Sequence, residues 1–151
     1  MPRIERTARI GWAGNVARGE GLVSADTGAF TDLGYSLPTR IGQPEGKTSP
    51  EELLAAAHGG CFTMSLASEL TQVGHPPGHL DITCQIVMDE VEGQGHQIVG
   101  SNLTAAVDVP GLDEATLASA VALADENCPF SSLLKRGGVT LTISAELSVG
   151  A

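Results

Sequence analysis

Basic residues are scarce in this sequence. Eight lysines and arginines stand against 18 aspartates and glutamates, which gives a formal net charge of −10 at pH 7. A negative surface repels the phosphates of nucleic acids and the anionic headgroups of membranes. We therefore expect neither nucleic acid nor a membrane as a partner.

Long hydrophobic runs are also missing. The uncharged stretch from Leu53 to Ala67 is shorter than the roughly 18 residues that a membrane span requires. The N-terminal residues MPRIERTARIGW contain no apolar core of signal-peptide length. There is no internal repeat, low-complexity tract or long linker, and 151 residues are enough for one core. We expect a cytoplasmic protein whose residues 1–151 form a single domain.

Cysteines are few and far apart. Cys61, Cys84 and Cys128 are odd in number and form no Cys-x-x-Cys pair. This spacing excludes a secreted disulfide framework and a paired zinc or redox motif. In a reducing compartment they are either packing residues or reactive thiols.

The first third of the chain is typical of short strands and turns. Ala8, Ile10 and Trp12 alternate with polar or small residues, and GNVARGEG and DTGAF follow as turn sequences. The segment YSLPTRIGQPEGKTSP, rich in proline and glycine, predicts a long loop that carries Arg40.

The segment SPEELLAAAHGGCFTMSLASEL predicts a long helix. Ser49 is a good N-cap, Pro50 suits the first helical position, and Glu52 lies where a capping-box acid is found. The helix should end near Gly74. An apolar stripe and an opposite side that is also small or apolar predict a helix buried nearly all round, part of which meets a second subunit; the stripe comprises Leu54, Ala57, Cys61 and Met64.

The rest of the chain predicts an α+β fold with antiparallel sheet packed on helices. Alternating residues at 82–88 and 103–109 indicate a hairpin, and Asp113 is a candidate cap for a second helix. Pro129 should break that helix, and a short helix follows it. Residues 139–147 alternate without fault and predict the last strand.

The three thiols differ in what their positions indicate. Cys84 shares a strand face with apolar residues, which favours simple packing. Gly59 and Gly60 are poor helix formers directly before Cys61, so they indicate close approach of another backbone or of a substrate. Cys128 lies at a predicted helix start, where the backbone N–H groups favour thiolate. Pattern alone leaves packing and reactivity open for Cys61 and Cys128.

A metal site is a weaker alternative. His58 and Cys61 are three residues apart, so one helix face could present both to a metal ion. Zinc would need two further ligands, and the remaining histidines, acids and cysteines show no recognised ligand spacing. We expect no metal and no other cofactor.

Two of these segments carry a resemblance to a known family. SPEELLAAAHGGCFTMSLASEL resembles the cysteine-bearing helix of the OsmC/Ohr thiol-dependent peroxidases, and CPFSSLLK resembles the segment with their second cysteine. The likeness extends from GWAGNVARGEG through VPGLDEATL to the last strand and is closer to the OsmC branch. It implies an OsmC-like fold, with antiparallel sheets on a long buried central helix and a second helix, in an intertwined homodimer.

The resemblance also implies an activity and a site. The family reduces organic hydroperoxides, and hydrogen peroxide more weakly, in oxidative and osmotic stress defence, with an external dithiol such as a lipoyl group as reductant. Cys61 corresponds to the peroxidatic cysteine, Cys128 to the resolving cysteine and Glu51 to the catalytic acid. Arg40 is our choice for the family's arginine, with Arg18 as the alternative.

Glu51 and Cys61 pose a geometric problem. Ten helical residues correspond to a rise of about 15 Å, so the two side chains cannot meet within one straight helix. We expect either that Glu51 acts on the Cys61 of a partner subunit or that the helix bends sharply at Gly59 and Gly60.

Two other functions remain open from the sequence. One is a small-molecule-binding dimer whose thiols only pack, and the other is a thiol redox sensor. Peroxide-driven loss of two thiols per chain would exclude the first, and turnover with a dithiol would exclude the second.

Overall fold

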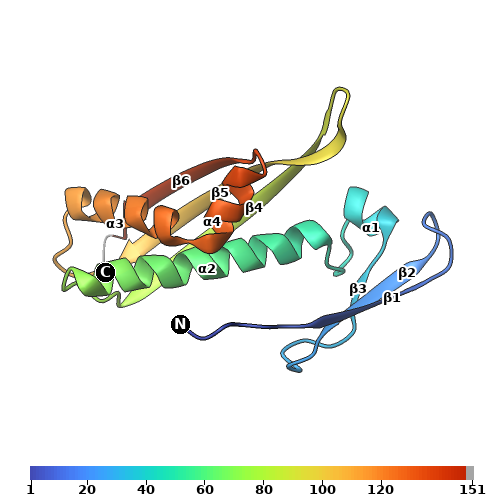
Figure 1. Ribbon diagram of the computed structural model, residues 1–151, viewed down its shortest axis with the longest axis horizontal. Coiled ribbons are helices and arrows are strands. Elements are labelled where there is room, and N and C mark those ends of the chain that lie inside the picture. Colours follow the sequence, from blue (N-terminus) through green and yellow to red (C-terminus); the bar gives the residue numbers. More distant parts are fainter. Residues whose placement is uncertain (149–151) are drawn as a thin grey trace. The chain divides into compact units, whose positions relative to one another are not determined.

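The computed structural model describes residues 1–148 and divides into two compact units, residues 1–50 and the chain from Glu51 onward. The first unit contains an antiparallel sheet in the order β1 (Ala8–Ala13), β2 (Glu20–Ala25) and β3 (Leu33–Tyr35), drawn in blue and cyan in Figure 1. The alternation at the N-terminal end of the sequence therefore predicted the first strand correctly.

Gly21 lies on the central strand, β2, where its lack of a side chain permits close packing. It pairs with Trp12 on β1 and with Tyr35 on β3. A Cβ atom at Gly21 would lie only 2.3 Å from the Tyr35 ring. Only glycine therefore lets the ring of Tyr35 lie over β2, where it is 5.6 Å from the ring of Trp12.

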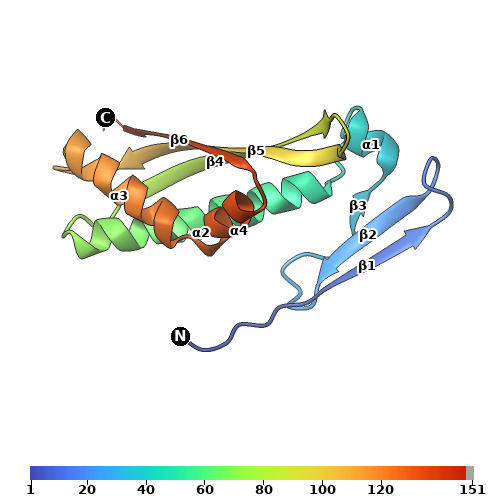
Figure 2. The same ribbon diagram turned by 45° about the horizontal axis from the view of Figure 1, so that its top comes forward.

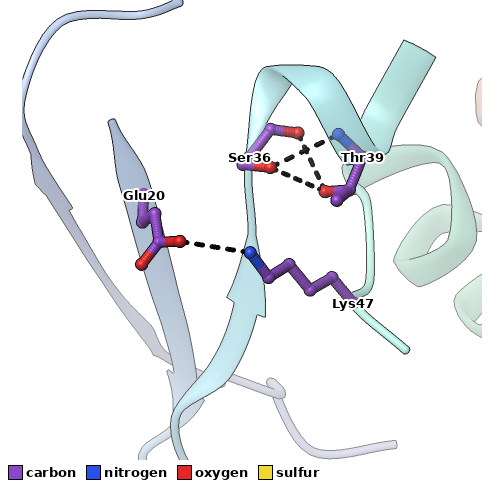
Figure 3. A network of polar contacts seen from close by, with 4 residues as sticks. All are labelled: Glu20, Ser36, Thr39 and Lys47. Atoms are coloured by element: carbon purple, nitrogen blue, oxygen red, sulfur yellow. Dashed lines mark hydrogen bonds and ion pairs between the residues drawn. The ribbon is translucent and has the colours of Figure 1, made fainter. Parts of the chain in front are cut away.

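A short helix, α1 (Leu37–Ile41), occupies part of the segment that was expected to be a loop. Ser36 caps it: the Thr39 N–H donates to Ser36 Oγ at 3.3 Å, and the two hydroxyls are 2.8 Å apart (Figure 3). Lys47 follows α1 and donates to Glu20 on β2 at 3.2 Å. The loop prediction was wrong here because a serine cap and a proline in the first turn start a helix locally.

The second unit contains a sheet in the order β4 (His79–Val91), β5 (Gly95–Asp108) and β6 (Thr140–Leu147). β4 and β5 form the predicted hairpin, but β6 is parallel to β5. The expectation of a purely antiparallel sheet was wrong. Two helices, α3 (Glu114–Asn127) and α4 (Pro129–Arg136), connect β5 to β6 and return the chain to the end where β5 began.

All the helices of this unit cover one face of its sheet, as Figures 1 and 2 show. Every second residue of β5 is buried against them, namely Ser101, Leu103, Ala105 and Val107. On β6 every second residue is exposed, namely Thr140, Thr142, Ser144 and Glu146. The period-two pattern of the strands thus indicates which face receives α2, α3 and α4.

The long helix α2 (Pro50–Gln72) begins directly after Ser49 and ends before Gly74, as predicted. Gly74 has a φ of 83°, and the N–H of His75 donates to the Leu70 carbonyl at 2.9 Å, which is a typical glycine-dependent helix end. Within the part of the chain that the structure describes, no helix is both long and apolar enough to cross a membrane.

The buried face of α2 is not the predicted stripe. The residues that it buries are His58, Gly59, Phe62, Leu66 and Leu70. Met64 is 76% exposed in this chain. Within one chain the packed face of α2 differs from the predicted stripe, because small and apolar residues occur on every side of α2 and composition does not distinguish the face that packs on the sheet. A helix buried nearly all round, with a second subunit covering part of it, stays a prediction.

Leu66→Ala should lower the free energy of unfolding by about 2–5 kcal/mol, because the leucine is fully buried and its truncation leaves a cavity. Leu133→Ala is the matched control, since Leu133 is also helical but 63% exposed, and it should change stability by less than about 0.5 kcal/mol. Urea unfolding of both variants measures the difference. Equal losses would contradict this assignment of the core.

Candidate functional site

Two of the three cysteines lie together in the second unit. Cys61 on α2 is half-buried, and Cys128, between α3 and α4, is fully buried. Both are free thiols, Cys61 packs against the buried cluster that contains Cys128, and the two side chains are close enough to influence each other's charge. The structure therefore brings together the two cysteines that the sequence analysis singled out as a reactive pair.

Cys128 is held at the junction of two helices. It ends α3 and is the N-cap of α4, with an extended backbone at φ −78° and ψ 114°. The N–H of Ser131 donates to its sulfur at 3.5 Å. The break at Pro129 and the restart of a helix, both predicted from the sequence, are confirmed. They leave the Cys128 sulfur facing backbone N–H groups, which favour negative charge.

The first turn of α4 also serves the other sulfur. The backbone N–H of Phe130 lowers the pKa of the Cys61 thiol, and Phe130 is one residue before the amide that donates to Cys128. The start of α4 therefore influences both cysteines.

The surroundings of Cys61 favour its protonated form. Burial raises the pKa of the Cys61 thiol, and the hydrogen bond and charge of Cys128 raise the pKa further. The Phe130 N–H acts in the opposite direction but is the smallest of these effects. A reactive thiolate at Cys61 thus requires a positive charge nearby.

His58 is the principal feature that sequence reasoning missed. Its side chain is fully buried, with Nδ1 2.7 Å from Ser101 Oγ and Nε2 2.9 Å from Ser131 Oγ. The sulfur of Cys84 lies 3.5 Å from the same Ser101 hydroxyl and 3.8 Å from Nδ1. Because both ring nitrogens are engaged by hydroxyls, His58 does not present a free nitrogen to a metal ion alongside Cys61.

The charge state of His58 follows from this burial. Burial lowers the pKa of the imidazole, the negative charge of Asp125 opposes that shift, and the positive charge of Lys135 adds to it. Asp125 and Lys135 are themselves ion-paired. His58 is therefore a neutral imidazole at pH 7, with one donor and one acceptor for its two serine partners. Within residues 1–148 no group of three or more histidines, cysteines or acids could hold a metal ion.

The close packing of α2 against Cys84 on β4 explains the glycine at position 59. A Cβ atom there would lie 3.1 Å from the Cβ of Cys84 on β4, so the neighbour that approaches Gly59 is a side chain and not the backbone or substrate that was expected. Gly60 has no such neighbour within 4 Å. Cys84 packs against the edge of the core, as predicted.

The two candidate arginines belong to the first unit. Arg40 is in the last turn of α1 and, with Trp12 and Tyr35 among others, lines a pocket of about 210 Å³ in the first unit. Arg18 lies in the turn between β1 and β2, where its backbone N–H donates to Asn15 Oδ1 at 2.9 Å. The structure does not place either arginine relative to Cys61.

Glu51 is in the first turn of α2, and the helix continues without interruption through Gly59 and Gly60 (Figures 1 and 2). A sharp bend at these glycines is therefore wrong as an explanation. Glu51 and Cys61 of the same chain are separated by a rise of about 15 Å.

The chain is similar to known proteins over most of its length. The family model of OsmC-like proteins matches residues 42–144. Peroxiredoxin OsmC of Escherichia coli (strain K12) is 36% identical over 132 residues, which are 87% of this chain and 91% of the relative. An organic hydroperoxide resistance protein of Xanthomonas axonopodis pv. citri is 30% identical over 75% of this chain and 78% of its own length.

Solved structures show the same fold. The organic hydroperoxide resistance protein OhrB of Bacillus subtilis superposes with a TM-score of 0.70, at 25% identity, over 93% of this chain and 98% of that one.

The buried histidine should make stability depend on pH. Above the ordinary histidine pKa of 6.5, His58 is neutral in both the folded and the unfolded chain, so its full contribution is present. As pH falls below 6.5 the unfolded chain takes up a proton first, and the free energy of unfolding falls by up to about 1.4 kcal/mol per pH unit.

Urea unfolding between pH 7.5 and 5.5 measures this slope, and His58→Gln should remove the corresponding part of it. The other three histidines are present in both proteins, so the difference between the two curves isolates His58. Identical slopes would show that His58 is not buried as a neutral group.

Proposed function

The chain belongs to the OsmC-like protein family and is a thiol-dependent peroxidase, and we propose that it reduces organic hydroperoxides to alcohols through Cys61 and Cys128. Relatives named for peroxiredoxin activity and for organic hydroperoxide resistance support this function. The observation that carries the mechanism is the packing of the two free thiols in one buried cluster beside the start of α4.

Cys61 is the peroxidatic residue in this proposal. Its thiolate attacks the outer oxygen of the hydroperoxide, the O–O bond breaks, and the inner oxygen leaves with a proton as the alcohol. The sulfur is thereby oxidised to sulfenic acid. The Phe130 N–H, which lowers the pKa of this thiol, stabilises the negative charge on the sulfur before attack.

Cys128 is the resolving residue. Its sulfur attacks the sulfenic sulfur of Cys61, the S–O bond breaks, and hydroxide leaves with the Cys128 proton as water. The product is a Cys61–Cys128 disulfide. An external dithiol of the dihydrolipoamide type supplies the two electrons that restore both thiols, so the cycle uses no prosthetic cofactor.

Arg40 and Glu51 complete the proposed chemistry. Because burial and Cys128 raise the pKa of Cys61, an arginine is needed to favour the thiolate, and a guanidinium remains charged at any working pH. We assign this role to Arg40 in preference to Arg18. Glu51 orients the peroxide and the guanidinium.

The proposal also includes an assembly of two subunits, which the length of α2 supports. Since α2 is continuous from Glu51 to Cys61, Glu51 acts on the Cys61 of a partner subunit in a homodimer. The two units of the chain function together as one OsmC-like domain. In the cell such a protein acts in the cytoplasm, in defence against oxidative and osmotic stress.

Steady-state turnover with a dithiol tests the proposed function. The wild-type protein should reduce cumene hydroperoxide faster than hydrogen peroxide, because the sulfur is half-buried behind apolar residues. Cys61→Ser should abolish turnover. Cys84→Ser is the control, because Cys84 does not take part in the proposed cycle, and it should retain most of the activity.

Wild-type protein that stays fully reduced in the presence of both peroxides would contradict the proposal. Cys84→Ser losing activity to the same degree as Cys61→Ser would contradict the choice of nucleophile.

The choice of arginine is tested by Arg40→Gln and Arg18→Gln. The substitution at the functional arginine should lower the second-order rate with cumene hydroperoxide by roughly 100-fold or more, because one charge that stabilises the thiolate is lost. We expect this loss for Arg40 and a change below about threefold for Arg18. The opposite result would transfer the role to Arg18.

A further inference from the structure

We propose that His58 is a positioning residue for disulfide closure, holding the start of α4 through Ser131 so that the Cys128 sulfur meets oxidised Cys61. This inference rests on the proposed function, because it assigns His58 to the second step of that cycle. It follows from a continuous path of buried contacts in the second unit.

The path crosses three elements. Ser101 on β5 contacts one ring nitrogen of His58 on α2, and the other ring nitrogen contacts Ser131 on α4. The Ser131 backbone N–H then donates to the Cys128 sulfur. All four residues on this path are fully buried, namely His58, Ser101, Ser131 and Cys128. The start of α4 is thus tied to the same helix that carries Cys61.

Burial makes this connection sensitive to substitution. A buried hydroxyl that loses its hydrogen-bond partner costs about 1–3 kcal/mol, and the segment can avoid that cost only by moving. The Ser131 hydroxyl and the Ser131 amide belong to one residue, so a shift that finds the hydroxyl a new partner also moves the amide away from Cys128. The cap of α4 therefore depends on His58.

Closure is the step that requires this placement. The Cys128 sulfur must approach the sulfenic sulfur in line with the breaking S–O bond, and a misplacement of about 1 Å can cost on the order of 100-fold in rate. Cys61 is carried by α2 itself, one turn after His58, so its own position does not depend on the contact with Ser131. Loss of that contact should slow closure much more than the first attack.

The two ring nitrogens allow a matched pair of variants. The terminal amide of glutamine extends to the region of Nε2 and can keep the contact with Ser131, whereas that of asparagine extends only to the region of Nδ1 and can keep the contact with Ser101. His58→Gln should therefore retain closure and His58→Asn should lose it. Ser131→Ala removes the contact with Nε2 by deleting the serine hydroxyl. Ser101→Ala removes only the contact with Nδ1.

Closure can be measured without peroxide. Cys61 attacks dithiobis(nitrobenzoate), which releases one thionitrobenzoate and leaves the other bound to Cys61 as a mixed disulfide. Attack by Cys128 then expels the second thionitrobenzoate and forms the Cys61–Cys128 disulfide. Stopped-flow absorbance resolves the two releases, and Cys128→Ser identifies the second one by its absence.

We expect the second release to be at least tenfold slower in His58→Asn and Ser131→Ala, and within about threefold of wild type in His58→Gln and Ser101→Ala. The first release should change by less than about threefold in all four. Second-release rates near wild type in both His58→Asn and Ser131→Ala would overturn the inference, and so would a glutamine variant as slow as the asparagine variant. Far-UV circular dichroism checks that each variant is folded, and Ser131→Ala tests the contact if the asparagine variant is not.

The same variants with cumene hydroperoxide separate this inference from the proposed function. Slow closure after the mixed disulfide, together with no oxidation by peroxide, would refute the peroxidase function and leave the role of His58 intact. Rapid sulfenic acid formation with unchanged closure would support the peroxidase function and refute the role of His58. Where both hold, the slow variants should also accumulate Cys61 sulfinic acid by mass spectrometry, because an unresolved sulfenic acid remains open to a second peroxide.

Discussion

The parallel pairing of β6 with β5 is the constraint on which the second unit depends. A parallel neighbour cannot be reached by a tight turn, so the chain must cross the sheet before it returns. Here α3 and α4 make that crossing on the face that α2 also covers. The junction between α3 and α4 therefore comes to lie against α2, and Cys128 is at that junction.

The start of α4 contacts or influences several neighbouring groups. Its Pro129 ends the preceding helix, its Ser131 N–H donates to the Cys128 sulfur, and its Ser131 hydroxyl contacts the buried His58. Its Phe130 N–H lowers the pKa of Cys61. A helix N-terminus is a favourable place for a thiolate because its N–H groups have no partners within the helix. The net effect on Cys61 is nevertheless a raised pKa, since burial outweighs one amide. In the proposed mechanism, a positive charge beyond the start of α4 is therefore needed to favour the Cys61 thiolate.

Local sequence signals predicted the elements well. The cap at Asp113, the break at Pro129, the end of α2 before Gly74 and the hairpin of β4 and β5 are each encoded within a few residues, and each is confirmed. The direction of β6 could not be read in this way, because alternation indicates a strand but not its partner or its orientation.

Contacts between side chains that are distant in sequence could not be predicted either. Cys61 and Cys128 were recognised as a pair, but the hydrogen bonds of His58 join residues 43 and 73 positions apart. Nothing in the residues around His58 signals two serine partners on different elements. The face of α2 that packs on the sheet of its own chain was not identified for a related reason, since alanine, glycine and serine residues occur on several sides of this helix and only packing selects the side that includes Phe62 and Leu66.

The central claim is that Cys61 and Cys128 form one redox pair while Cys84 remains a packing residue. Peptide mapping under non-reducing conditions, after one equivalent of cumene hydroperoxide per chain, measures this most directly. The account predicts a Cys61–Cys128 disulfide within one chain and a Cys84 that is still a free thiol. A disulfide that includes Cys84, or three thiols that all remain reduced, would contradict it.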